Sequence, residues 1–119
     1  RMQLIGRAMA RARIERDGRL IYTWLQRDDF ESTGAIPQDS EDVINLTLSV
    51  GETQVAVILV EQRDGTVKIS FRSRCDVDCR LVAEQFGGGG HKNASGALLS
   101  EPLAVARAKV LDAVRAAMR

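Results

Sequence analysis

Four consecutive glycines and the only histidine of the chain, at positions 87–91, form the segment best suited to chemistry. Glycine lets the backbone approach a ligand closely, and the peptide N–H groups of such a run can surround an anion. The imidazole that follows can donate a further hydrogen bond, and Lys92 lies beside it. The sequence therefore predicts a phosphate-binding loop, with a purely structural turn as the alternative. Its predicted contact residues are Gly88, Gly89, Gly90 and His91.

Arginines precede this loop in the segment 70–74. The segment ends an expected strand, and an expected helix then leads to the glycines, an order that could bring Arg72 or Arg74 near His91. A guanidinium offers two parallel hydrogen bonds to a phosphate, so Arg72 is predicted to assist the loop. A solvated charge at a strand end is the alternative for either arginine alone.

Other chemistries find little support in the sequence. The glycine run follows an expected helix and lacks a Gly-Lys-Ser/Thr, which excludes the dinucleotide fingerprint and the P-loop. Cys75 and Cys79 with one histidine do not make a zinc site and are expected to be reduced, partly buried thiols. No Ser-His-Asp arrangement can be argued from spacing. No residue of this chain is predicted to be catalytic or to bind a metal.

The composition is that of one ordinary globular domain: 119 residues, 45% hydrophobic, 28% charged, with a formal net charge of +1. That charge excludes a strongly basic nucleic-acid coat, so any anion binding must be local. Two cysteines fit a reducing compartment and a cytoplasmic location. No apolar run approaches the roughly 20 residues of a membrane span. Because the chain starts at Arg1 without an initiator Met, we expect a piece of a longer protein.

In the first half of the chain, the elements that must position these residues are read from apolar spacing. Residues 2–16 have helical spacing closed by Asp17-Gly18, and residues 19–26 form a strand in which Trp24 is packed. Residues 28–34 form a short helix. Residues 39–50 alternate like a strand but are flanked by helix caps, and a helix is favoured.

In the second half, a continuous apolar run predicts a strand over 54–61, and a turn at Asp64-Gly65 pairs it with 66–73. A helix capped by Asp76 ends at Gly87, residues 95–99 form a strand, and Ser100 caps a final helix. The predicted fold is therefore α/β (or α+β), a single compact domain with a mixed sheet of about four to five strands packed with helices.

Three segments, 68–73, 77–78 and 83–96, together resemble the C-terminal GGGH-motif domain of DHH-family phosphoesterases. The closest resemblance is to the bacterial group of oligoribonucleases and 3′-phosphoadenosine 5′-phosphate (pAp) phosphatases, with cyclic-dinucleotide phosphodiesterases nearby. Residues 52–100 carry the similarity. It implies that 1–119 is a DHH-associated substrate-binding domain whose residues 1–16 end an interdomain linker helix.

The resemblance also implies a two-domain enzyme. An N-terminal DHH domain would bind two manganese ions and activate the hydrolytic water, while the GGGH domain holds the nucleotide or terminal phosphate. The positions carried over are Arg72, Gly88, Gly89, Gly90 and His91, with Ser73, Arg74 and Asn93 as further candidates. No Asp-His-His sequence occurs here, so this chain, which lacks the catalytic domain and has no cofactor of its own, is not expected to hydrolyse a substrate by itself.

The leading hypothesis is thus the substrate-binding domain of a manganese-dependent phosphoesterase acting on short oligoribonucleotides, pAp or cyclic-dinucleotide-derived substrates. Its expected partners are a nucleotide or short single strand, the DHH domain of the same polypeptide and a second copy in a homodimer, with no membrane. The alternative is a non-catalytic nucleic-acid-binding module, as in the C-terminal domains of alanyl-tRNA synthetases or single-strand exonucleases. That alternative uses Arg7, Arg11, Arg13 and Lys92 as its footprint. A third hypothesis is an interaction domain whose glycines allow tight packing.

Overall fold

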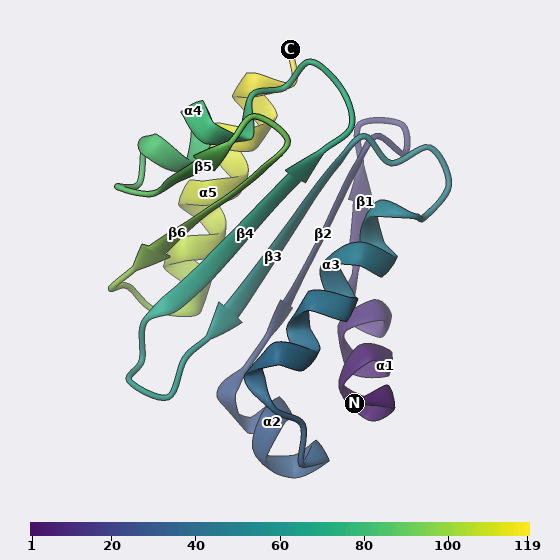
Figure 1. Cartoon of the computed structure of the whole chain (residues 1–119), viewed down its shortest axis with the longest axis vertical. Coiled ribbons are helices and arrows are strands. Elements are labelled where there is room, and N and C mark those ends of the chain that lie inside the picture. Colours follow the sequence, from purple (N-terminus) through teal and green to yellow (C-terminus); the bar gives the residue numbers. More distant parts are fainter.

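An uninterrupted apolar segment sets the centre of the sheet. Strand β3 (Val55–Glu61) has six consecutive buried residues, as expected of a strand covered on both faces. In the computed structural model, which describes residues 1–119, β2 (Leu20–Leu25) lies parallel to β3, and β4 (Val67–Ser73) lies antiparallel on its other side. These three strands form the middle of a six-stranded mixed sheet (Figure 1).

Three further strands complete the sheet, in the order β1-β2-β3-β4-β6-β5. At one edge, β1 (Arg13–Glu15) pairs antiparallel with β2. On the other side, β6 (Ala94–Leu99) pairs antiparallel with β4, and β5 (Gly89–His91) pairs antiparallel with β6. The glycine segment therefore lies at a sheet edge.

Helices cover the two faces of the sheet unequally (Figure 1). On one face, α1 (Met2–Arg11) and α3 (Ser40–Leu48) pack over β2 and β3. On the other face, α4 (Cys79–Glu84) and α5 (Leu103–Ala117) pack over a larger core. The connection from β2 to α3 consists of α2 (Arg27–Thr33) and the short 3-10 helix η1 (Pro37–Asp39). None of these helices has both the length and the apolar character needed to span a lipid bilayer.

Each face of the sheet has its own apolar cluster. The α1–α3 side contains Leu4, Ala8, Ile21, Leu25, Val43, Ile44, Ala56, Ile58 and Val60. The α4–α5 side is centred on Phe71 and includes Cys79, Val82, Val110 and Val114. The α1–α3 cluster stops at β3, so on that face β6 and β5 have no helical cover and β4 is approached only by α3. Lys68, Leu98 and His91 are accordingly exposed.

The predicted α/β class and mixed sheet are confirmed, although the sheet has six strands rather than four or five. The strands expected over 19–26, 54–61, 66–73 and 95–99 are present, as are the helices expected over 28–34 and 39–50. Trp24 is packed, as predicted, against the α4–α5 core.

The helix predicted over residues 2–16 was too long. It ends at Arg11, because Ala12 adopts an extended backbone with φ −54° and ψ 141°. Arg13 to Glu15 then pair with β2, opposite Tyr22 to Leu20. Backbone hydrogen bonds to a neighbouring strand outweigh the helical spacing of this short segment.

Both predicted helix caps in the second half were misplaced. Asp78, not Asp76, caps α4, and its carboxylate accepts hydrogen bonds from the backbone N–H groups of Arg80 and Leu81 at 3.0 and 3.3 Å. At α5 the N-cap position belongs to Pro102 rather than Ser100, and no side chain caps the helix. The first case reflects two carboxylates two residues apart, between which local sequence does not discriminate.

Candidate anion-binding site

The first two glycines of the segment form the C-terminal end of α4. The Gly88 N–H donates to the Ala83 carbonyl at 2.9 Å, and the Gly87 N–H donates to the Glu84 carbonyl at 3.2 Å. Gly87 has φ 78°, a conformation that favours glycine, and the two bonds are those of a Schellman helix end. The first glycine is therefore needed for the fold, and the turn directs the chain toward β6.

Two of the remaining glycines are required by close packing. A Cβ on Gly88 would lie 2.1 Å from the Gly96 carbonyl oxygen, and one on Gly90 would lie 2.7 Å from the Cα of Ser95. Gly89 differs, because a Cβ there would meet nothing within 4 Å. The fold thus explains Gly87, Gly88 and Gly90, while Gly89 has a bare backbone for which packing within the chain gives no reason.

The segment that was predicted to be a loop is the edge strand β5, which forms a hairpin with β6. His91 pairs with Ala94, so Lys92 and Asn93 form the connection. The Lys92 carbonyl accepts from the Cys79 N–H at 2.7 Å, and the Asn93 carbonyl accepts from the Ser73 N–H at 3.0 Å. These bonds fix the hairpin against the start of α4 and the end of β4.

The side chains of Asn93 and Ser73, two of the further candidates, also help to fix the hairpin. The Asn93 side-chain amide donates to the Ser73 hydroxyl at 2.9 Å, and that hydroxyl donates to the Val77 carbonyl at 3.0 Å. Ser73 is buried on the α4–α5 side of the sheet. The guanidinium of Arg74 donates to the Leu48 carbonyl at the end of α3, at 2.6 Å. In this structure all three side chains hold elements together.

Sheet register brings Arg72 and His91 to the same face. Arg72 pairs with Ala94 across β4 and β6, and Ala94 pairs with His91 across β6 and β5. Directly paired residues in antiparallel strands project to one side of a sheet, so the three form a row on one face, beside the α1–α3 cluster. The backbone separation of Arg72 and His91 is about 10 Å, or two strand spacings. Only the methyl group of Ala94 stands between them.

The row beside it carries almost no side chains. Ser70 pairs with Gly96, and Gly96 pairs with Gly89. The bare backbone of Gly89 therefore adjoins the Arg72–Ala94–His91 row, on the same face. Sequence analysis singled out the glycines but not Ser70 and Gly96, which lie beside the row only through the pairing of β4 with β6.

Arg72 has only weak partners within the chain. Its guanidinium donates to the Phe71 carbonyl at 3.0 Å and lies 3.8 Å from a carboxylate oxygen of Glu41 on α3. Glu41 is exposed, and an ion pair of this length near water contributes little free energy. Replacing Glu41 with a ligand anion would therefore cost the guanidinium little free energy. At the other end of the row, His91 is exposed.

The arrangement offers hydrogen-bond donors of the kind that an anion requires. No group of three or more His, Cys, Asp or Glu side chains lies close enough to hold a metal ion, so the residues of this chain do not fit a two-metal site. Burial raises the pKa of the Cys79 thiol, which disfavours the thiolate that a nucleophile requires.

Comparisons with known proteins relate this chain to one family. The sequence model of the DHHA1 domain matches residues 17–119. The chain is 36% identical over 114 residues to a protein of Thermus thermophilus named bifunctional oligoribonuclease and PAP phosphatase NrnA, covering 95% of this chain and 33% of that protein. The chain thus spans about a third of the length of this curated relative.

Solved structures share the fold. An exopolyphosphatase-related protein from Bacteroides fragilis superposes with a TM-score of 0.81 and 26% identity, over 98% of this chain and 33% of that one. The C-Ala domain of Aquifex aeolicus alanyl-tRNA synthetase superposes with a TM-score of 0.57 and 14% identity, over 79% of this chain and 86% of that one. At 14% identity the second likeness concerns the fold alone.

Proposed function

Because the chain belongs to the DHHA1 domain family, we propose that it is the substrate-binding domain of a DHH-type phosphoesterase. In this proposal Arg72 and His91 hold a terminal phosphate of a nucleotide or short oligoribonucleotide. The observation that carries it is the Arg72–Ala94–His91 row on one face of the sheet. Hydrolysis, with its two manganese ions, is assigned to a DHH domain of the same polypeptide.

The physical argument is that the side chains of Arg72 and His91 supply hydrogen-bond donors on either side of a sheet surface that carries almost no side chains. A guanidinium gives bidentate hydrogen bonds to phosphate oxygens, and an imidazole N–H adds a donor from the other side. The floor between them carries a methyl group at Ala94 and bare backbone at Gly89, so a phosphate and its ribose can approach closely. The name of the Thermus thermophilus relative favours oligoribonucleotides and pAp as the substrates to test first.

The alternative of a general nucleic-acid-binding module is less well supported by the arginines on which it relies. The guanidinium groups of Arg7 and Arg11 both contact the Asp29 carboxylate, at 3.3 and 2.5 Å. Arg13 lies over the Trp24 ring, 5.7 Å from its centroid. These three side chains are therefore engaged within the domain rather than arranged as a free basic surface.

An amide-resolved NMR titration of the 119-residue chain with pAp and with a 5′-phosphorylated diadenylate tests the proposal. We expect shifts to cluster at Arg72 and at residues 89–93. His91→Ala should weaken binding by about 1–3 kcal/mol, the scale of a lost charge-assisted hydrogen bond.

The matched control is Arg80→Ala, which removes an exposed cation on α4 and should leave affinity unchanged. Equal affinity of wild type and His91→Ala would remove the imidazole from the site. Absence of any shift with either ligand would overturn the proposal that this chain contains a phosphate-binding site.

A further inference from the structure

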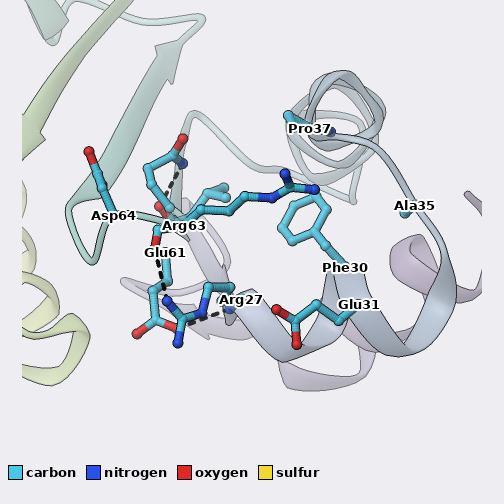
Figure 2. A pocket seen from close by; sticks show the side chains of 10 residues that line it. Arg27, Phe30, Glu31, Ala35, Pro37, Glu61, Arg63 and Asp64 are labelled. Atoms are coloured by element: carbon cyan, nitrogen blue, oxygen red, sulfur yellow. Dashed lines mark hydrogen bonds between the residues drawn. The ribbon is translucent and has the colours of Figure 1, made fainter.

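A cavity of about 480 Å³ lies where the β3–β4 hairpin approaches α2 and η1 (Figure 2). Its lining combines the aromatic ring of Phe30 and the apolar groups of Ala35, Pro37 and Val60 with the charged side chains of Arg63 and Glu31, among others. The volume lies within the range of small-molecule sites. No sequence pattern indicates this cavity, because α2 and the hairpin meet only in the folded chain.

Some of the charged groups at the cavity are already occupied. The Glu61 carboxylate accepts from the Arg27 N–H at 3.0 Å, and the Arg27 guanidinium donates to the Arg63 carbonyl at 2.8 Å. The Asp64 carboxylate accepts from the hydroxyl and N–H of Thr66.

Two charged side chains remain available to a ligand. The guanidinium of Arg63 and the carboxylate of Glu31 make no hydrogen bond or ion pair, and Figure 2 shows Arg63 extending toward the ring of Phe30. An aromatic ring, a planar cation and a free acceptor therefore face one space.

The cavity lies on the same face of the sheet as the candidate site. Val60, which lines it, pairs with Lys68 of β4. Lys68, Ser70 and Arg72 alternate along β4, so they project to one side of the sheet. Lys68 is exposed and makes no ion pair. A line of donors thus runs along β4 from Arg72 to Lys68, which pairs with a residue that lines the cavity.

The spacing of this line suits an extended nucleic-acid strand. Alternate residues of a strand lie about 7 Å apart, so a guanidinium, a hydroxyl and an ammonium group follow one another over about 13 Å. That repeat is comparable to the distance between successive phosphates of an extended single strand. A phosphate at the Arg72–His91 row would place the next two near Ser70 and Lys68.

We propose that the cavity is a nucleobase subsite of an extended oligonucleotide site, an inference that rests on the proposed function. In this proposal Lys68 holds the phosphate that precedes the base in the cavity. Single-strand binders stack bases on aromatic rings and arginine planes, as Phe30 and Arg63 allow. The Glu31 carboxylate can accept from a base amino group. The carboxylates of Glu31, Glu61 and Asp64 at the cavity also disfavour a phosphate inside it.

The experiment measures the affinity of the 119-residue chain for 5′-phosphorylated adenylates of one to four nucleotides. We expect affinity to rise with length until a base reaches the cavity, at the third or fourth nucleotide. Phe30→Leu, which keeps an apolar group at this packed position, should lose about fivefold or more of that rise, the scale of one stacked base. Arg63→Ala should act in the same direction.

Lys68→Ala tests the phosphate contact separately. It should leave mononucleotide affinity unchanged, weaken the three- and four-nucleotide ligands, and lower the salt dependence of log affinity by about 0.7, the share of one phosphate contact. Lys109→Ala is the control, because Lys109 lies on α5 and is paired with Glu101. Ligands with an abasic third or fourth position should behave like shorter strands if the cavity holds a base.

The outcomes separate the two proposals. A mononucleotide that binds with no gain from added nucleotides would overturn the extended site and leave the proposed function intact. Equal affinity for abasic and intact strands would overturn the base subsite. No binding at any length would overturn both.

Discussion

The position of each glycine in the segment 87–90 determines what its missing side chain does. Gly87 provides the left-handed turn that ends α4, and Gly88 and Gly90 let β5 approach β6 closely. Gly89 has space above it, on the same face as Arg72 and His91. Three glycines of the run therefore serve the fold, and only Gly89 is left for the proposed ligand contact, so single substitutions can separate the two roles.

Gly88→Ala should destabilise the domain by about 1–3 kcal/mol, because its Cβ would meet the Gly96 carbonyl and the chain must shift to accommodate it. Gly89→Ala should leave the free energy of unfolding within about 0.5 kcal/mol of wild type and still weaken phosphate binding, since its methyl group would occupy the bare floor. Urea unfolding and a pAp titration of both variants measure the two effects. A Gly89→Ala variant with unchanged affinity would show that the ligand does not approach this backbone.

At the scale of elements, α4 links the end of β4 to the glycine segment. It spans only Cys79–Glu84, and its first turn depends on the Asp78 carboxylate. A helix this short has little stability of its own, so its cap and its packing decide whether it forms.

Asp78→Ala should therefore lower the free energy of unfolding by about 1 kcal/mol, the usual value of an N-cap. Asp76→Ala is the matched control, because Asp76 is exposed and makes no hydrogen bond to the helix. Thermal or urea unfolding of the two variants distinguishes them. Equal losses would mean that general charge near the helix start, rather than the cap, provides the stabilisation.

Elements with a strong local pattern could be predicted from the sequence. The apolar run of β3, the alternation in β4 and the cap-type residues Asp39 and Gly51 that flank α3 carry their own signals. Strands β1 and β5 could not be predicted, because each has three residues and exists only by pairing with a neighbour. Their short length leaves no periodicity to detect.

The same reasoning applies to the candidate site. Arg72 and His91 were predicted from residue type and chain order, but their alignment across Ala94 follows from the register of β4, β6 and β5. Lys68 lay in a visible alternation, yet its relation to the cavity depends on pairing with Val60. Sequence analysis therefore identifies candidate residues that lie close together in the chain. It misses those that only the pairing of distant strands brings together.

At the scale of the whole molecule, a largely buried ion cluster fastens α1 to α2. Asp29 is 1% exposed, and its carboxylate accepts from Arg11 at 2.5 and 2.7 Å and from the Gln26 N–H at 2.6 Å. Burial raises the pKa of the Asp29 carboxyl, but these hydrogen bonds outweigh it, so its pKa lies below the ordinary value.

A carboxyl whose pKa is lowered by folding stabilises the folded state above its unfolded pKa, about 3.9, and this contribution is lost as pH falls through the lower folded pKa. Asp29→Asn should therefore cost roughly 2–3 kcal/mol at neutral pH, somewhat less than a fully buried pair because Arg11 keeps some contact with water. The difference from wild type should shrink below about pH 4. Urea unfolding at a series of pH values measures this difference in the free energy of unfolding. Asp28→Asn is the control, because Asp28 is the exposed neighbour of Asp29. A pH-independent difference would mean that packing, not charge, holds the two helices.

The shortness of the two edge strands has a consequence for self-association. β1 and β5 have three residues each, whereas the four inner strands have six or seven. A short edge offers few unpaired backbone groups to the sheet of another molecule, and charged residues in β1 and glycines in β5 are poor partners for such pairing. The two edges of the sheet therefore resist the edge-to-edge stacking that leads to aggregation.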